Sequence, residues 1–302
     1  MTPTSTISST GTASLSRPRL TARWKRDLRW SAAHGGSKVY TFTPKPTGTR
    51  WYHSHDVAGK DLTRSMYAGL YGFLIIEPTN DPGRYDKEVL LAAHHWEGRW
   101  VSMQDIRKGP PPDNGLEVMY SAASFNDKML GHGEPVRVRD GERVLFRLLN
   151  ASATENIKLA LPGHRFTVLT LDGNPVPTAT AVDVVALAPA ERADVIVEMS
   201  RPGVWIMGEI DDDYRKMGLG IVIEYANQRG EPQWSEPPKA QWNYTAFGRQ
   251  GTVPEPDGVF PRRSRKSWAV GVATTAGRLM ASHGRTQTRC SRSNEANATD
   301  SS

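Results

Sequence analysis

Short strand-like segments recur at regular spacing between Lys87 and Tyr225, and this rhythm constrains the fold more than any other feature of the 302-residue chain. The turn Asp140-Gly141 separates two of these segments and predicts a hairpin between them. Short strands separated by turns at this spacing predict an antiparallel sandwich or barrel and leave no room for βαβ crossovers. The expected strands are 88–93, 135–139, 142–149, 157–161, 165–171, 183–187, 193–198, 203–208 and 219–225.

Further strand-like segments precede this unit. Alternating residues at 38–43, the run 49–55 and the apolar run 70–76 each have the length and pattern of a strand, and 44–48 has the composition of a turn. Strands so few and so short make part of a domain rather than a whole one.

The two ends of the chain differ in composition from the body. The formal net charge is +6, and the basic excess lies in residues 1–36 and 261–302, so the stretch between them is net acidic. Both ends have few large aliphatic side chains. Residues 1–36 are expected to be a disordered or foreign segment, and residues 261–302 a basic disordered tail. Because the basic residues lie in these segments, nucleic-acid binding is not expected.

Composition excludes several other classes of protein. The longest apolar runs, 69–76 and 181–190, are far shorter than the roughly 20 residues that cross a bilayer, so a transmembrane protein is not expected. The single cysteine, Cys290, excludes an intramolecular disulfide and any Cys-based zinc or iron–sulfur site. No signal peptide is visible near the N-terminus, and the sequence predicts no compartment.

The segment His53-Ser54-His55 is the main candidate for chemistry. Residues i and i+2 of a strand project to the same face, so two imidazoles could bind one metal or each serve one metal of a close pair. Imidazole suits copper, zinc, iron and nickel. A His-x-His pair alone is weak support, because two hydrogen-bonded structural histidines would give the same pattern.

The residues around this pair carry a longer motif. Gly48-Thr49-Arg50-Trp51-Tyr52-His53-Ser54-His55, followed by Leu70 to Pro78, resembles the second copper-ligand block of the multicopper oxidases. The segments 141–151, 163–173, 189–194 and 242–248 are similar to recurrent elements of that family's second domain. The resemblance implies an all-β, cupredoxin-like Greek-key β-sandwich: residues 37–84 would end a first domain, 85–227 would form a complete second domain, and 228–260 would be an interdomain linker.

The resemblance also implies copper, with His53 and His55 as type 3 ligands. Full-length members of the family couple one-electron oxidation of a small-molecule or metal-ion reductant to the reduction of oxygen to water. This chain departs from the pattern, because the family's copper sites take ten His and one Cys and the chain has eight His. No His neighbours Cys290, so type 1 and type 2 sites are not expected, and the chain looks like an incomplete oxidase fragment.

A second hypothesis is a catalytically silent cupredoxin module that acts in binding or assembly. Unpaired edges of the incomplete first domain could then drive self-association.

Other polar residues are expected to have structural roles. Adjacent strand residues point to opposite faces, so His94 and His95 are expected to be structural. The residues expected to serve turns, solvated loops or packing around the His pair are His132, His164, Asp211-Asp212-Asp213, Trp51 and Tyr52.

Overall fold

A computed structural model describes residues 7–8, 39–40, 42–53, 69–78, 84–97, 120–239, 241–249 and 251. The chain divides into two compact units, Met1–Arg249 and Gln250–Ser302. The fold below belongs to the first unit. Nearly all of the predicted disordered segments 1–36 and 261–302 lies outside the described residues; the exception is the short strand β1 (Ile7–Ser8), which pairs antiparallel with β2 (Val39–Tyr40).

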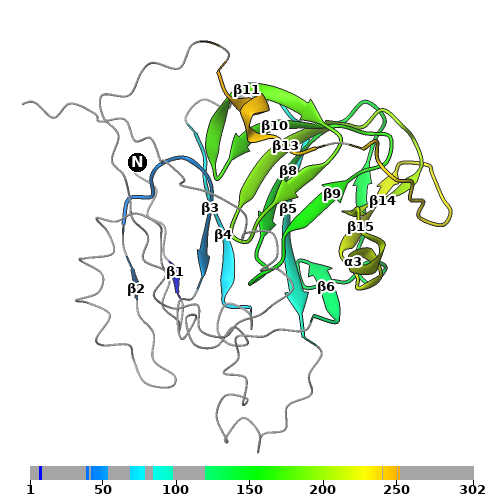
Figure 1. Cartoon of the computed structure of the whole chain (residues 1–302), viewed down its shortest axis with the longest axis horizontal. Coiled ribbons are helices and arrows are strands. Elements are labelled where there is room, and N and C mark those ends of the chain that lie inside the picture. Colours follow the sequence, from blue (N-terminus) through cyan, green and yellow to red (C-terminus); the bar gives the residue numbers. More distant parts are fainter. Residues whose placement is uncertain are drawn as a thin grey trace, which may run out of the picture. The chain divides into compact units, whose positions relative to one another are not determined.

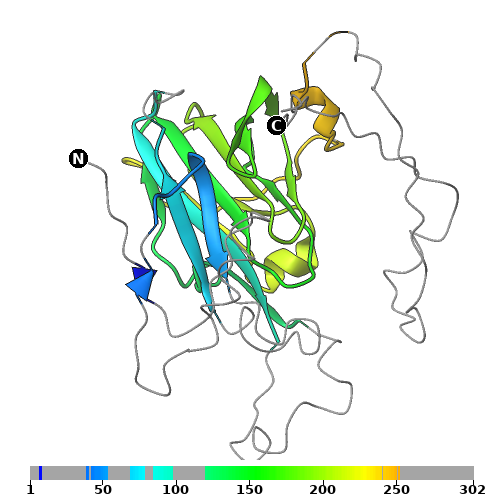
Figure 2. The ribbon, with the colours of Figure 1, turned by 90° about the vertical axis from the view of Figure 1, so that its left-hand side faces the viewer.

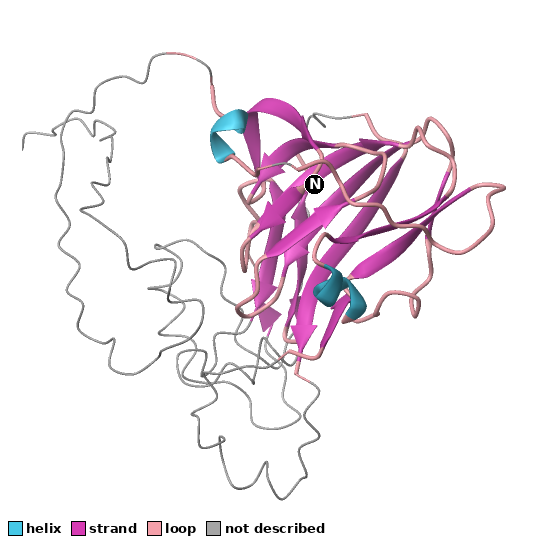
Figure 3. Ribbon diagram, turned by 45° about the vertical axis from the view of Figure 1, so that its right-hand side comes forward, coloured by secondary structure: helices cyan, strands magenta, loops and turns pink. Residues whose placement is uncertain are grey.

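The main body consists of two sheets, which confirms the predicted all-β sandwich (Figures 1 and 3). The six-stranded sheet has the order β11 (Asn174–Val182), β10 (Phe166–Leu171), β13 (Arg192–Glu198), β8 (Arg143–Asn150), β5 (Lys87–Trp96) and β6 (Ala122–Phe125). The five-stranded sheet has the order β12 (Val185–Leu187), β9 (Ile157–Ala160), β14 (Val204–Glu209), β15 (Gly220–Tyr225) and β7 (Val136–Val138).

The hydrophobic core lies between these sheets. In β8, alternation sends Val144, Phe146 and Leu148 into the core, and all three are fully buried. Burying an aliphatic or phenyl side chain of this size contributes about 1.5–3 kcal/mol. The opposite face of β8 carries Leu145, Arg147 and Leu149, and these are buried as well. A second layer must therefore cover the outer face of the six-stranded sheet.

That layer includes an antiparallel hairpin. The strand β3 (Gly48–His53) pairs with β4 (Tyr71–Ile76) from Gly48↔Ile76 to His53↔Tyr71. Trp51 packs with Ala92 and Leu149 of the six-stranded sheet and with Ala151, which follows β8, and Tyr71 and Phe73 lie at its side. Figure 2 shows the hairpin lying along the sandwich, with β3 in blue and β4 in cyan, beside the green strands. We call residues 48–53 and 71–76 the β3–β4 hairpin.

Two topological expectations are wrong. The turn Asp140-Gly141 does not close a hairpin: β7 pairs with β15 and β8 pairs with β5 and β13, in different sheets. Gly141 has the positive φ (+78°) that such a turn needs, but this requirement is local and does not fix which strands pair. The sandwich is also not wholly antiparallel, because the pairs β7–β15 and β5–β8 are parallel. Both join strands distant in sequence, so no βαβ unit is needed.

The acidic run near residue 212 is also organised differently from the expectation. It begins the short helix α3 (Asp212–Lys216) rather than lying in a plain loop. Asp211 caps the helix, since its Oδ1 accepts from the backbone N–H of Asp213 at 2.8 Å. All three carboxylates are exposed, as a solvated face requires.

The segment expected as a linker packs on the sandwich in its described part. Gln233 exchanges backbone hydrogen bonds with Val204 and Ile206 of β14. Farther on, the 3-10 helix η1 (Tyr244–Phe247) places Phe247 in the main core, and Thr180 donates to the carbonyl of Ala246. In the part of the chain that the structure describes, no helix is long and apolar enough to cross a membrane.

Candidate metal centre

His53 is the last residue of β3 and shares a face with Thr49 and Trp51, the face that meets the sandwich. Its imidazole is partly exposed and stacks on the Trp51 ring, with centroids 4.2 Å apart and planes 22° from parallel. The predicted packing role of Trp51 is confirmed. Ser54 and His55, the second predicted ligand, lie outside the described residues.

The beginning of β3 is held by polar contacts. Thr49 Oγ1 donates to Asp194 Oδ1 at 2.5 Å and accepts from Arg147 Nη1 at 2.9 Å. Arg50 donates from Nη1 to the carbonyl of Asp172 at 2.7 Å and from Nη2 to that of Gly173 at 3.0 Å. The strand that carries His53 is thus bound to β13, β8 and the β10–β11 turn.

Tyr71 lies opposite His53 in the hairpin and connects it to the sandwich. Its ring stacks on His94, with centroids 5.2 Å apart, and its hydroxyl lies 3.5 Å from Asp127 Oδ1. Burial, helped by the negative charge of Asp127, raises the pKa of Tyr71 well above its ordinary value. The phenol therefore stays neutral at physiological pH.

The neighbours His94 and His95 point to opposite faces of β5, as predicted. His94 lies against the hairpin, and its Nδ1 is 2.7 Å from the carbonyl of Ala151. His95 faces the inner side, with Nδ1 3.1 Å from Ser152 Oγ. Both are fully buried, and burial, with His94 beside it, lowers the pKa of His95 to about 4. A single metal ion could not take both imidazoles without a large rearrangement of β5.

His164 and His132 have the structural roles expected of them. His164 Nδ1 lies 2.9 Å from the carbonyl of Pro162, and Nε2 lies 2.5 Å from the hydroxyl of Tyr225. The Tyr225 oxygen in turn accepts from the N–H of Arg201. Burial lowers the pKa of His164, which matches a neutral ring with both nitrogens engaged. His132 is exposed in the turn before β7.

The donor set fits copper only in part. Imidazole is a suitable ligand for copper, and His53 sits on a firmly held strand. Within the described ranges, however, no group of three or more His, Cys, Asp or Glu side chains could hold a metal ion. The whole chain has eight His and one Cys, fewer than the full family set of copper ligands.

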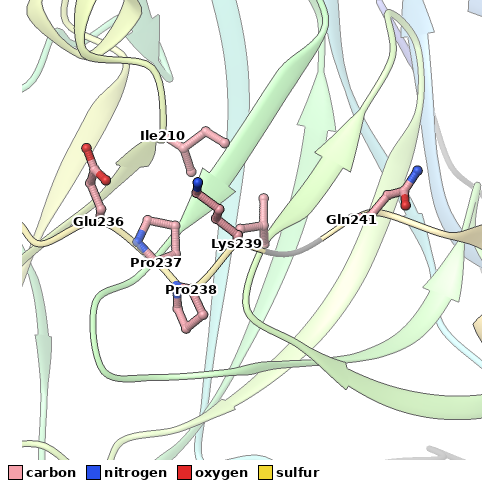
Figure 4. A pocket seen from close by; sticks show the side chains of 7 residues that line it. Ile210, Glu236, Pro237, Pro238, Lys239 and Gln241 are labelled. Atoms are coloured by element: carbon pink, nitrogen blue, oxygen red, sulfur yellow. The ribbon is translucent and has the colours of Figure 1, made fainter.

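An open cavity of about 510 Å³ lies elsewhere on the sandwich (Figure 4). Val184, Ile210 and the segment 236–239 line it, together with Gln241. Glu236 and Lys239 are the charged groups among these lining residues, and none of the candidate metal ligands is there. The cavity is therefore separate in its residues from the His53 region and adds no metal-binding chemistry to it.

Sequence reasoning missed two buried charges beneath the hairpin, Arg147 and Asp194, which are 8% and 2% exposed. The signal was present, since each charged residue has apolar neighbours on both sides in the chain, Phe146 and Leu148 for Arg147 and Ala193 and Val195 for Asp194. Charged residues are almost never buried unless they are paired. Their partner could not be read from the sequence, because Thr49 is far away along the chain.

Two sequence profiles described as "Multicopper oxidase" match the chain, one over residues 95–217 and one over residues 30–81. Among curated proteins, it is 25% identical over 244 residues to "Multicopper oxidase MmcO" of Mycobacterium tuberculosis, covering 72% of this chain and 45% of that protein. It is 28% identical to "Laccase-2" of Podospora anserina, covering 55% of this chain and 26% of that protein. The chain thus spans less than half the length of these relatives.

Solved structures of copper oxidases also resemble this chain. The "Blue Copper Oxidase from Nitrosomonas europaea" is 27% identical with a TM-score of 0.53, covering 63% of this chain and 60% of that one. "Multicopper Oxidase mgLAC" is 27% identical with a TM-score of 0.55, covering 65% and 62%. The fold is cupredoxin-like, as predicted, and the chain belongs to the multicopper oxidase family.

Proposed function

We propose that this chain contributes copper ligands to a copper-dependent oxidoreductase, and that His53 and His55 each supply one imidazole. One observation carries the proposal: His53 stands at the end of a docked strand, inside the motif Gly48 to His55 and within the profile match at residues 30–81. By the same resemblance, residues 37–84 belong to a first cupredoxin domain and residues 85–227 form a second.

The bound copper would supply one-electron chemistry between a small-molecule or metal-ion reductant and oxygen. The chain's own residues would hold the copper ligand His53 in position. The hairpin fixes the imidazole of His53 at one end of β3, and the ring of Trp51 stacked on it limits its rotation. The contacts of Thr49 and Arg50 hold the other end of the strand against the sandwich.

The ligand count limits what the chain does by itself. Eight His cannot supply ten imidazoles, so we expect the purified chain to have neither the blue colour of a type 1 copper nor the near-ultraviolet band of an oxygen-bridged cupric pair. Copper affinity should be weak, and it should fall as the pH drops through about 6.5, where imidazole is ordinarily protonated.

Calorimetric titration with Cu²⁺ between about pH 5.5 and 7.5 tests this proposal, a range centred on the imidazole pKa. His53→Ala and His55→Ala should each abolish binding, whereas His132→Ala, at an exposed turn, should leave it unchanged. Binding that survives both substitutions would overturn the site. Oxidase turnover with stoichiometric copper would overturn the claim of an incomplete site, and no Cu²⁺ binding at all would favour a silent binding or assembly module.

A further inference from the structure

Asp194 and Arg147 form a buried polar joint beneath the β3–β4 hairpin. We propose that they are positioning residues: they hold Thr49 at the start of β3 and thereby set the place of His53 at its end. The copper part of this inference rests on the proposed function, while the docking part does not. We call Thr49, Arg147, Asp194 and Thr170 the Asp194 joint.

Every oxygen of the Asp194 carboxylate has a donor. Oδ1 accepts from Thr49 at 2.5 Å, and Oδ2 accepts from Thr170 at 2.7 Å and from Arg147 at 3.2 Å. Thr49 comes from the hairpin, whereas the other donors come from strands of the six-stranded sheet. Asp194 is therefore the point at which a hairpin residue enters the hydrogen bonding of the sandwich.

Arg147 balances the charge of this joint. Its Nη1 donates both to Thr49 and to Asp194, and its Nε pairs with Glu88. Removing such charges from water is costly, and well-packed apolar residues of similar volume often stabilise a fold as well or better. The joint is therefore poorly explained by stability alone. Directional hydrogen bonds to a fixed carboxylate instead define where Thr49 must lie.

The backbone next to Thr49 fits the sandwich equally closely. Gly48 (φ +116°) and Gly173 (φ +70°) face each other, and a Cβ on Gly173 would come within 2.5 Å of the Thr49 carbonyl oxygen. Arg50 and Arg192 both donate to the carbonyl of Asp172, at 2.7 and 3.0 Å. The start of β3 is thus fixed on two sides, by Asp194 and by the β10–β11 turn.

Displacement of Thr49 would reach His53 through the strand itself. Thr49, Trp51 and His53 share the face that meets the sandwich, and a strand rises about 3.3 Å per residue, which puts His53 about 13 Å beyond Thr49. The aromatic packing of Trp51 alone is not directional. The Asp194 joint therefore fixes the position of β3 along the sandwich, and Trp51 fills the space between the hairpin and the six-stranded sheet.

A set of three variants tests this proposal. Thr49→Val removes the hydroxyl and keeps the shape, Thr49→Ser keeps the hydroxyl, and Thr170→Val removes a different hydroxyl from the same carboxylate. The readouts are amide hydrogen exchange of the β3–β4 hairpin relative to β8 and β13, and the electron paramagnetic resonance spectrum and affinity of Cu²⁺.

Thr49→Val should speed exchange in the hairpin about ten- to hundredfold relative to β8, as the loss of a hydrogen bond to a charged group predicts. It should also weaken Cu²⁺ binding about tenfold, in the range seen for residues that orient metal ligands, and alter the spectrum. Thr49→Ser should restore both readouts. Thr170→Val should change the hairpin's relative exchange far less than Thr49→Val, because Thr49 and Arg147 still donate to the Asp194 carboxylate.

The outcomes separate the two proposals. Equal effects of Thr49→Val and Thr170→Val, or failure of Thr49→Ser to restore exchange, would overturn the positioning role. If the wild-type chain binds no Cu²⁺, the proposed function fails and the exchange data alone decide the joint. If it binds Cu²⁺ and Thr49→Val leaves the spectrum unchanged, the joint does not position His53.

Discussion

The two faces of the six-stranded sheet are buried in different ways. The inner face meets the five-stranded sheet through apolar side chains, such as Val144, Phe146 and Leu148 of β8. The outer face meets the β3–β4 hairpin through an aromatic patch around Trp51 and a buried polar joint around Asp194. Apolar packing tolerates small shifts, whereas a carboxylate with three donors accepts few arrangements. Packing at the inner face therefore stabilises the fold, whereas the hydrogen bonds at the outer face fix the position of the β3–β4 hairpin.

The largest expected effect comes from the inner face. Phe146→Ala should lower the free energy of unfolding by about 3–5 kcal/mol, because a fully buried ring leaves a cavity between the sheets. Urea denaturation measures this loss, and exchange should accelerate throughout the sandwich and the hairpin. Phe146→Leu is the control, with an expected loss under about 1.5 kcal/mol. A loss confined to the hairpin would contradict the assignment of Phe146 to the central core.

Acid should act through the inner face more than through the hairpin. The folded pKa of His95, about 4, lies below the ordinary 6.5, so between those values the unfolded chain binds more protons than the folded chain. Stability is therefore fully present above about pH 6.5 and is lost as the pH falls toward 4, by up to about 3 kcal/mol.

Thermal or urea unfolding at pH 7.5 and pH 5 measures this dependence, as the difference between wild type and His95→Gln. The difference cancels other groups, such as Glu209, whose pKa burial raises to about 7 and which acts in the opposite direction. If His95→Gln shows the full acid sensitivity of the wild type, another group is responsible.

On the outer face, Trp51→Ala should cost about 2 kcal/mol, since the ring is buried by the hairpin contact rather than between the sheets. Hydrogen exchange should show the loss mainly in β3 and β4, while β9 and β14 keep their protection. Trp51→Phe retains an aromatic ring and should recover most of the difference. Loss of protection spread evenly over both sheets would erase the contrast between the two faces.

The smallest expected effect isolates the close approach at the β10–β11 turn. Gly173→Ala and Gly131→Ala both place a side chain at positive φ, +70° and +83°, but only the first meets another residue, because nothing lies within 4 Å of a Cβ on Gly131. Gly173→Ala should therefore be less stable than Gly131→Ala by about 1 kcal/mol, the lower end of the cost of overpacking. Equal values from urea denaturation would mean that the hairpin shifts away freely.

Much of the fold was predictable from local pattern. The expected strands at 142–149, 157–161, 165–171, 193–198 and 219–225 all occur, with ends shifted by a residue or two. The edge strand β11 was missed because Pro175 and Pro177 lie in it, and proline within a strand is tolerated at a sheet edge. The pairing of β7 and β8 was predicted wrongly, because a turn signal does not tell which sheet each strand will join.

Only those parts of the candidate site that depend on residues close together in the sequence were predictable. The pattern of His53 and His55 gave the candidate ligands, and alternation along β5 correctly separated His94 from His95. Arg147 and Asp194 remained unassigned because their role depends on Thr49, which approaches them only after the hairpin folds onto the sheet. Such contacts depend on tertiary packing, which no local pattern encodes.

The stacking of Trp51 on His53 has an optical consequence. Copper(II) quenches the emission of an indole that it approaches, and the two ring centroids are only 4.2 Å apart. The chain has nine tryptophans, so the Trp51 contribution is the difference between wild type and Trp51→Phe. Copper bound at His53 would quench this Trp51 contribution to the fluorescence, whereas copper bound elsewhere would leave its intensity unchanged. The hairpin thus contains its own fluorescent reporter of where copper binds.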